Sequence, residues 1–440
     1  MIIGISEGFH DAAICVLDDN KIVFASHAER HSRKKGDKYL HWYQLSKIRD
    51  NRDAIVAYYE KPFSKNLRRL YAGQKWKKPR IRYDVSFRHH ESHAAAGYYT
   101  APFDDCNIIV VDAIGEWDTV SIWDNMKKVK SWKYPYSLGL LYSAITQRIG
   151  LKPNEDEYIT MGMAAFGEPI FDLSNLLYKN NHRGVGNIWK DARPEDLAAS
   201  VQALYEKKLL ELVDMCPKKN IILMGGCALN CVANSKIQGK NIWIMPSPGD
   251  AGSALGAAAL VQKRKLQWDG PYLGTDIDRP IWVRGVIQEL LNNKVCGIAH
   301  GRAEFGPRAL GNRSLLGDPR YDIKDTVNDI KRRQRFRPFA PAILEEYADE
   351  YFEGPMNEYM QFVATAKHDY KSVTHVDGTA RVQVVKKNCK SVIRPILEEW
   401  YDATGCPMLL NTSLNIKGEP MVDSPRDATR FMEKYGVQVF

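Results

Sequence analysis

The sequence predicts an α/β protein with a duplicated N-terminal core, followed by a second domain of mixed α and β structure. Residues 2–26 and 107–124 share a pattern of short apolar strands separated by polar or glycine-containing turns. Apolar strands at 219–225 and 240–246 are each followed by a glycine-rich turn and a run of small residues typical of a helix. Two similar openings, with mostly helix between the later strands, indicate a duplicated core.

A polar segment at 268–279 separates this core from the rest of the chain. It contains proline and glycine and predicts a linker, which leaves a first domain over 1–267 and a second over 280–440. The first residues lack a basic region followed by a long apolar run, so we expect no secretory signal. No stretch approaches the ~18 uninterrupted apolar residues of a membrane span. We therefore expect a cytoplasmic protein without a membrane partner.

The net charge of +9 over 440 residues permits an anionic substrate. Residues 61–88 contain ten basic residues and one acidic residue, and five aromatic residues are interleaved with them. Basic residues with aromatic neighbours suit a phosphate backbone and stacked bases, so a nucleic-acid partner is one interpretation of this strip. A solvated basic helical surface is the alternative, and we prefer it because charge runs usually have that role.

The segment HHESHAAAGYY at 89–99 predicts a helix with a metal site. His89 and His93 are four residues apart, so they share one helix face and can bind one ion, whereas His90 is rotated away. Asp112 follows an apolar strand, and Asp250 stands at an expected helix start. Two histidines and two carboxylates suit Fe, Mn or Zn better than Ca. The alternative is a pair of hydrogen-bonded surface histidines.

The turn GGCALN at 225–230 is a candidate nucleotide site. Paired glycines after a strand let the backbone approach a phosphate or a ribose closely. A tight turn without a ligand is the alternative. The chain has neither a Gly-x-Ser-x-Gly elbow nor a GxxxxGK[ST] loop, so the serine hydrolase and P-loop classes lose support.

The second domain carries a candidate anion site. From Arg302 to Arg337 there are ten basic residues and five acidic ones, and several arginines stand among glycine and proline. Such arginines bind phosphate and carboxylate oxygens with two parallel hydrogen bonds. Surface salt bridges would explain the charge but not the glycine and proline. Ser413 and Asn415 follow an apolar strand and offer short polar groups to a small ligand or an adenylate.

These segments together resemble the O-carbamoyltransferase family, which includes the nodulation-factor, cephem-antibiotic and aminoglycoside carbamoyltransferases. The resemblance spans nearly the whole chain in order. It runs through FHDAA (9–13), HHESHAAAGYY (89–99), VVDAIGEWDT (110–119), YSLGLLYSAITQRIG (136–150), GGCALN (225–230), PGDAGSALGAA (248–258), PYLG (271–274), EFGPRALGNRS (304–314), FRPFAP (336–341), HVDGTARVQ (375–383) and NTSLN (411–415).

The resemblance implies a fold and a reaction. The N-terminal domain would be similar to the tRNA threonylcarbamoyl transferase, with the actin and sugar-kinase fold, and the C-terminal domain would be YrdC-like. The C-terminal domain would make carbamoyl-adenylate from carbamoyl phosphate and ATP, releasing phosphate and pyrophosphate. The N-terminal domain would then move the carbamoyl group to an acceptor hydroxyl and release AMP.

The resemblance also implies roles for individual residues. The metal ligands would be the two histidines and two aspartates named above, and His10 with Asp11 would match the family's HD pair, as base and orienter at the acceptor side. The nucleotide would lie at Gly225, Gly226, Asn230, Gly249 and Glu116. Carbamoyl phosphate and the adenylate would contact Arg308, Arg313, Lys331, Arg333, Arg337, Arg381, Ser413 and Asn415.

The expected cofactors are ATP with Mg and a divalent metal, with Fe(II) favoured over Mn or Zn. The partners would be carbamoyl phosphate and a hydroxyl acceptor that is a sugar, a metabolite or a nucleoside, and a homodimer is the commonest assembly to expect. Ile159 stands where the family usually has lysine, and the chain is shorter than typical members. A threonylcarbamoyl transferase-like nucleic-acid modifier and a non-catalytic nucleotide-binding regulator are the alternative functions.

Overall fold

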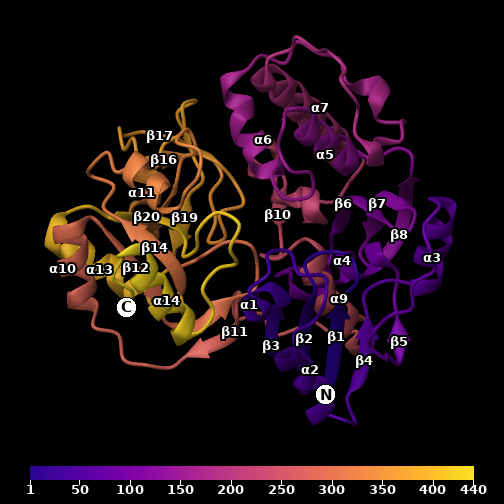
Figure 1. Cartoon of the computed structure of the whole chain (residues 1–440), viewed down its shortest axis with the longest axis horizontal. Coiled ribbons are helices and arrows are strands. Elements are labelled where there is room, and N and C mark those ends of the chain that lie inside the picture. Colours follow the sequence, from indigo (N-terminus) through magenta and orange to yellow (C-terminus); the bar gives the residue numbers. More distant parts are fainter. The chain divides into compact units, whose positions relative to one another are not determined.

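The computed structural model describes residues 1–440, which form two compact units (Figure 1). Unit 1 comprises Met1–Val23 and Lys38–Trp268, and unit 2 comprises Phe24–Asp37 and Asp269–Phe440. The short segment 24–37, which we expected in the first domain, therefore belongs to unit 2.

The segment 268–279 is not a linker. It contains strand β11 (Tyr272–Ile277), which pairs antiparallel with β13 (Gly301–Glu304) inside unit 2. Leu273 and Ile277 are buried on this strand, and its ladder is interrupted between Tyr272 and Asp276. The proline and glycine that indicated a flexible connection thus stand at the start of a short irregular strand.

Unit 1 contains two five-stranded sheets with the same topology, and this confirms the duplicated α/β core expected from the sequence. The sheet orders are β3-β2-β1-β4-β5 and β8-β7-β6-β9-β10. In both sheets the central strand, β1 or β6, pairs antiparallel with the next strand of the chain and parallel with the fourth. The strands are β1 (Ile2–Ser6), β2 (Ala13–Asp18), β3 (Lys21–His27), β4 (Ile55–Tyr58), β5 (Val85–Ser86), β6 (Asn107–Gly115), β7 (Asp118–Asp124), β8 (Lys127–Lys133), β9 (Asn220–Met224) and β10 (Asn241–Trp243).

Two helices of small residues, α4 (His89–Thr100) and α9 (Asp250–Gln262), form the layer between these sheets. They pack against each other, while α9 also contacts β1, β2 and β4 and α4 contacts β6 and β9. Glycine makes these close approaches possible, because a Cβ at Gly256 would lie 1.8 Å from the Ser92 carbonyl oxygen. The packing brings the N-terminal ends of both helices to the ends of β6 and β9.

The remaining helices of unit 1 lie outside this central layer. Helix α5 packs on β6, and α7 packs on α5 and α6. None of the helices is long and apolar enough to cross a membrane. Their bounds are α2 (Trp42–Asp50), α3 (Pro62–Tyr71), α5 (Leu138–Arg148), α6 (Glu157–Met163), α7 (Pro194–Asp214) and α8 (Cys231–Asn234).

Unit 2 is built around the mixed sheet β12-β14-β20-β15-β19, with smaller sheets β11-β13 and β16-β17-β18. Neighbouring residues on its strands, such as Leu315 and Leu316, face two different apolar clusters, as the alternation of a strand requires. The remaining strands are β12 (Val295–Ala299), β14 (Arg313–Gly317), β15 (Ala340–Leu344), β16 (Phe352–Glu353), β17 (Ala364–Ala366), β18 (Thr379–Ala380), β19 (Gln383–Val385) and β20 (Met408–Ser413).

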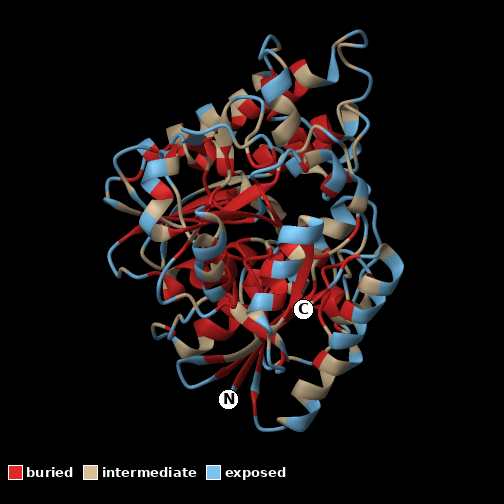
Figure 2. Ribbon diagram, turned by 90° about the vertical axis from the view of Figure 1, so that its left-hand side faces the viewer, coloured by how far each residue is buried: buried red, intermediate tan, exposed pale blue.

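Helices cover the main sheet of unit 2. Helices α10 and α13 pack against each other, and their buried residues belong to the same apolar cluster as β12 and β15. Figure 2 shows that the strands are mostly buried, whereas exposed residues lie on helices and loops. The helices are α1 (Ala28–Ser32), α10 (Val283–Asn293), α11 (Lys324–Ile330), α12 (Ala348–Tyr351), α13 (Ile393–Thr404) and α14 (Pro425–Tyr435).

Candidate metal centre and anion site

Four side chains converge in the middle of unit 1: His89, His93, Asp112 and Asp250. One donor atom from each lies within 4.8 Å of the others. His89 Nε2 is 2.8 Å from Asp112 Oδ2 and 3.1 Å from His93 Nε2, and His93 Nε2 is 3.4 Å from Asp250 Oδ1. The four side chains are 0–13% exposed. The structure thus brings together the four residues that the sequence indicated as ligands.

The two sheets and the two central helices explain this convergence. His89 and His93 are one turn apart at the start of α4, and Asp250 is the first residue of α9. Asp112 lies in β6 where its pairing with β7 is interrupted between Val111 and Gly115. An interruption of this kind re-aims a side chain, and here it directs the carboxylate at the histidines.

The electrostatics of the cluster favour a bound cation. Burial lowers the pKa of His93, but hydrogen bonds to Asp112 and Asp250 outweigh it and raise that pKa to about 9. Burial raises the pKa of Asp112, but the two histidines outweigh it and hold that pKa well below its usual range. Two buried carboxylates and two imidazole nitrogens aimed at one point fit Fe(II), Mn(II) or Zn(II).

Groups around the cluster fix its orientation. His93 Nδ1 lies 3.0 Å from the carbonyl oxygen of Pro248, so its Nε2 is left for the centre, as is usual for metal-binding histidines. His90 instead contacts Ser121 Oγ at 2.8 Å and points away. This agrees with the helical spacing, which excluded His90 as an equal candidate.

The glycine turns expected to bind nucleotide lie beside Asp112. The Gly225 amide donates to the Pro248 carbonyl, and the Gly226 amide lies 3.4 Å from Asp112 Oδ1. Gly225 has φ 90°, and a Cβ on it would be 2.2 Å from the Val111 carbonyl oxygen. Gly249 caps α9, and a Cβ there would lie 3.9 Å from Gly226 Cα. The two turns therefore lie side by side next to the metal cluster.

Two other expected nucleotide residues have internal partners. Asn230 caps α8 and exchanges two hydrogen bonds with Gln202, so its side chain supports the turn. Glu116 accepts the backbone amides of Lys61 and His89, and burial raises the pKa of its carboxyl group. Both side chains therefore organise the turns around the metal cluster.

His10 and Asp11 lie in the turn between β1 and β2. His10 Nδ1 is 2.8 Å from Asp11 Oδ2, and the two side chains are 35% and 40% exposed. Burial lowers the pKa of His10, but the hydrogen bond that His10 donates to Asp11 and the charges of Asp250 and Asp112 outweigh it and raise that pKa to about 9. The accessible imidazole is therefore within the electrostatic influence of the metal ligands.

Lys331 is the centre of a second cluster, in unit 2. Its buried Nζ contacts Ser413 Oγ at 3.3 Å, Asn415 Oδ1 at 3.1 Å and both backbone carbonyl oxygens of these residues. All four oxygens are neutral. Burial, together with Arg333 and Arg337, lowers the pKa of Lys331 well below its usual range. A buried ammonium beside two arginines is stabilised by an anion.

The four remaining expected anion ligands are all half-buried: Arg308, Arg333, Arg337 and Arg381. The Arg333 guanidinium lies 4.0 Å from the Phe339 ring centroid and donates to Asn328 Oδ1. Arg381 follows β18, and its Nε is buried without a hydrogen-bond partner. Arg308 is half-buried in the loop between β13 and β14.

Arg313 departs from the expectation that it contacts phosphate or carbamoyl oxygens. It is fully buried, and its guanidinium donates to the backbone carbonyls of five residues. The acceptors are Thr275, His300, Gly301, Asn312 and Asp423. Every N–H of the group has a protein acceptor, so Arg313 is a structural residue that joins β11, β14 and the segment before α14.

The sequence did not indicate Arg30 as a candidate functional residue, although the structure does. Arg30 lies in α1, is 2% exposed, and donates through Nη2 to the Gly306 carbonyl, while its Nε and Nη1 have no hydrogen-bond partner. Arg30 belongs to the segment 24–37, which is far in sequence from the rest of unit 2, so no motif of the second domain pointed to it. Ile159, where the family usually has lysine, is a buried residue of α6.

Two models of known protein families match most of the chain. A family model described as "Carbamoyltransferase N-terminus" matches residues 46–186 and 179–259, and one described as "Carbamoyltransferase C-terminus" matches residues 287–440. The N-terminal matches contain His89, His93, Asp112 and Asp250, and the C-terminal match contains Lys331, Ser413 and Asn415.

Individual relatives extend this result. An uncharacterized protein of Synechocystis is 31% identical over 98% of this chain and 93% of its own length, in an alignment of 574 positions. The nodulation protein NolO of Bradyrhizobium diazoefficiens is 31% identical over 77% of this chain and 75% of its own. Among solved structures, the match with the activator of 2-hydroxyisocaproyl-CoA dehydratase from Clostridium difficile covers 60% of this chain and 94% of the activator. The sequence identity is 15% and the TM-score is 0.40.

Proposed function

Because this chain belongs to the carbamoyltransferase family, we propose that it is an ATP-dependent O-carbamoyltransferase that works through carbamoyl-adenylate. The observation that carries the proposal is the convergence of His89, His93, Asp112 and Asp250 beside the accessible His10, within a chain whose two parts match the two carbamoyltransferase models. Carbamoyl phosphate, ATP with Mg and an acceptor hydroxyl would be the substrates.

The first half-reaction belongs to unit 2 in this proposal. Water cleaves carbamoyl phosphate to carbamate and phosphate, and a carbamate oxygen then attacks the α-phosphorus of ATP, so that pyrophosphate leaves. Lys331 and Arg333 supply positive charge, and Ser413 and Asn415 hold the Lys331 ammonium in place. Fixed donors of this kind stabilise the oxygens on which charge develops. Arg308, Arg337 and Arg381 would complete the site.

The second half-reaction belongs to unit 1. The acceptor oxygen attacks the carbonyl carbon of the adenylate, the bond to AMP breaks, and the hydroxyl proton passes to His10. The raised pKa of His10 opposes this role, because an imidazolium cannot accept a proton. Asp112 and Asp250 are two causes of that raise, so a cation held between them would move His10 toward its neutral form.

A divalent metal would be held by His89, His93, Asp112 and Asp250, and it would supply Lewis-acid stabilisation of a phosphate or carbonyl oxygen. The start of α9 at Gly249 would face the nucleotide phosphates, and Gly225 and Gly226, which lack side chains, would let the nucleotide approach the backbone closely. His93 is oriented by the Pro248 carbonyl, so its Nε2 needs no rearrangement to bind the ion.

Pyrophosphate release tests the first half-reaction. The full-length protein is incubated with ATP and carbamoyl phosphate, with and without Fe(II) or Mn(II), and without an acceptor. We expect pyrophosphate that depends on carbamoyl phosphate. A protein that binds ATP but releases no pyrophosphate under any metal, with or without candidate acceptors, would instead be a nucleotide-binding regulator.

The variant His10→Ala separates the two half-reactions. We expect it to release pyrophosphate at the wild-type rate and to lose transfer to an acceptor. Transfer at the wild-type rate by this variant would exclude His10 as the base. The variant Asp11→Asn should keep the imidazole in place but weaken its orientation, and should therefore cause a smaller loss of transfer.

A further inference from the structure

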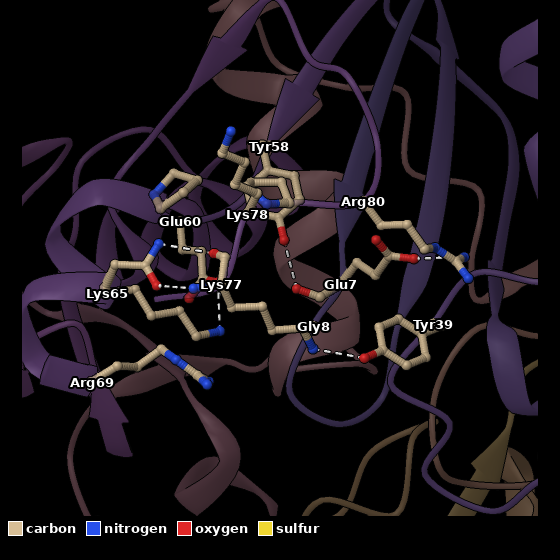
Figure 3. Close-up of a pocket in the computed structure, with 13 residues that line it drawn as sticks. Glu7, Gly8, Tyr39, Tyr58, Glu60, Lys65, Arg69, Lys77, Lys78 and Arg80 are labelled. Carbon is tan, nitrogen blue, oxygen red and sulfur yellow. Dashed lines mark hydrogen bonds and ion pairs between the residues drawn. The ribbon is translucent and has the colours of Figure 1, made fainter. Parts of the chain in front are cut away.

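Unit 1 contains an open pocket that is lined by neither the metal ligands nor the glycine turns (Figure 3). About 430 Å³ of space, including its open mouth, lies between α3, the loop that follows it and the end of β1. Its walls carry Glu7 and Gly8 after β1, Glu60 and Lys65 around the start of α3, and Lys77 from the loop. The basic strip 61–88 supplies most of this lining.

The charges in this pocket do not balance. Five cations and two carboxylates line it, and each carboxylate pairs with one cation: Glu7 with Arg80 at 2.9 Å and Glu60 with Lys65 at 2.5 Å. Arg69, Lys77 and Lys78 form no ion pair, which leaves a net charge of 5 − 2 = +3. Figure 3 shows these pairs on opposite sides of the pocket, with Lys77 between them.

The loop carrying these cations is fixed to helix α3. Asn66, which is 3% exposed, donates to the Lys77 carbonyl and accepts the Lys77 amide, both at 2.9 Å. Arg69 Nε donates to the Lys75 carbonyl, and Lys77 Nζ donates to the Tyr39 hydroxyl at 2.6 Å. The strip is therefore a short helix with a loop folded back on it, so only its first part, α3, is the helical surface that we preferred from the sequence.

The pocket borders the residues expected to carry out transfer. Lys65 Nζ lies 5.8 Å from the Phe9 ring, which packs at 4.4 Å on His10. On the other side, the Tyr59 ring packs 5.4 Å from His89, directly before Glu60 in the chain. A ligand in the pocket would thus be one layer of side chains from both His10 and the metal centre.

We propose that this pocket binds a phosphate group of the carbamoyl acceptor, so that the acceptor is a phosphorylated hydroxyl compound. The inference rests on the proposed transferase function. A phosphate monoester carries about −1.5 to −2 charges at neutral pH and suits three unneutralised cations better than a neutral sugar does. The phosphate is either that of a small sugar phosphate or the phosphodiester of a polynucleotide, since both present anionic phosphate oxygens to the cations.

Calorimetric titration of the full-length protein tests the pocket directly. The probes are ribose 5-phosphate, ribose and a single-stranded oligonucleotide. The variants are Arg69→Gln and Lys78→Gln, with Arg82→Gln as the matched control, because Arg82 is an exposed cation of the same strip that does not line the pocket. We expect ribose 5-phosphate to bind at least about tenfold more tightly than ribose, and each pocket variant to weaken it about tenfold.

The outcomes separate the alternatives. Oligonucleotide binding that Arg69→Gln weakens and Arg82→Gln leaves unchanged identifies a phosphodiester as the ligand and supports the proposal. Equal losses in all three variants indicate a solvated basic strip and overturn the proposal. A protein that binds ribose 5-phosphate no better than ribose and does not bind the oligonucleotide also overturns it. Pyrophosphate release by the same wild-type protein is measured separately. Selective phosphate binding without pyrophosphate release would refute the proposed transferase function but not phosphate binding in the pocket. Pyrophosphate release without selective phosphate binding would refute only the proposal about the pocket.

Discussion

Replacing Arg313 by lysine distinguishes a structural arginine from one that binds substrate. Its guanidinium has five N–H groups and donates to five backbone carbonyls inside unit 2. Lysine has three donors, so at least two of these carbonyls lose the hydrogen bond from residue 313. The Asn312 carbonyl also accepts the His300 amide, so at least one buried carbonyl is left without a partner. Each unsatisfied buried group costs about 1–3 kcal/mol, which predicts that Arg313→Lys lowers the free energy of unfolding by at least that amount.

Thermal unfolding followed by calorimetry measures this loss. For a unit of this size the unfolding midpoint should fall on the order of 10 °C. The companion variant is Arg308→Lys, which changes a half-buried arginine of the same EFGPRALGNRS segment. We expect Arg308→Lys to raise the KM for carbamoyl phosphate with little change in the midpoint. An unchanged midpoint for Arg313→Lys, with a raised KM for carbamoyl phosphate, would refute the structural role.

Three further changes test the metal centre, an ion pair and a turn. Asp112→Asn should lower metal affinity at least about tenfold, measured as metal content after dialysis. Glu91→Gln, which changes a carboxylate of α4 outside the cluster, should keep the metal. Arg394 holds the pKa of Glu346 at about 2, against 4.5 for a free glutamate, so this stability is present above pH ~4.5 and is lost as the pH falls toward 2. Because Glu346 is 31% exposed, solvent screens the ion pair, and Glu346→Gln should lower the unfolding free energy by only about 1–2 kcal/mol at pH 7. Near pH 2 the substitution should not change the unfolding free energy. A difference that does not depend on pH would contradict the ion pair. Gly225→Ala should cost more than ~2 kcal/mol because its φ is 90° and its Cβ would meet the Val111 carbonyl at 2.2 Å, whereas Gly226→Ala should cost less; equal losses would argue against the close approach.

Much of the candidate metal centre was predictable from local patterns. The i, i+4 spacing of His89 and His93 determines one helix face whatever the tertiary fold, and it also excluded His90. The alternation of strands and glycine turns likewise indicated a duplicated α/β core. The pairing of Lys331 with Ser413 and Asn415 followed from the family resemblance, and the structure places their side chains in contact.

The sequence by itself determined which residue types are available and how they repeat along helices and strands. Only the tertiary structure decided which charges are already neutralised. Arg313 and Lys331 look alike in the sequence, but the carboxylates of Glu304 and Asp423 offset the charge of Arg313. Lys331 has only neutral oxygens as hydrogen-bond partners and lies near Arg333 and Arg337. In the strip 61–88, Glu7 and Glu60 neutralise Arg80 and Lys65, and the remaining cations form the pocket. These outcomes depend on contacts between residues far apart in the chain, and such contacts have no periodicity for a sequence pattern to reveal.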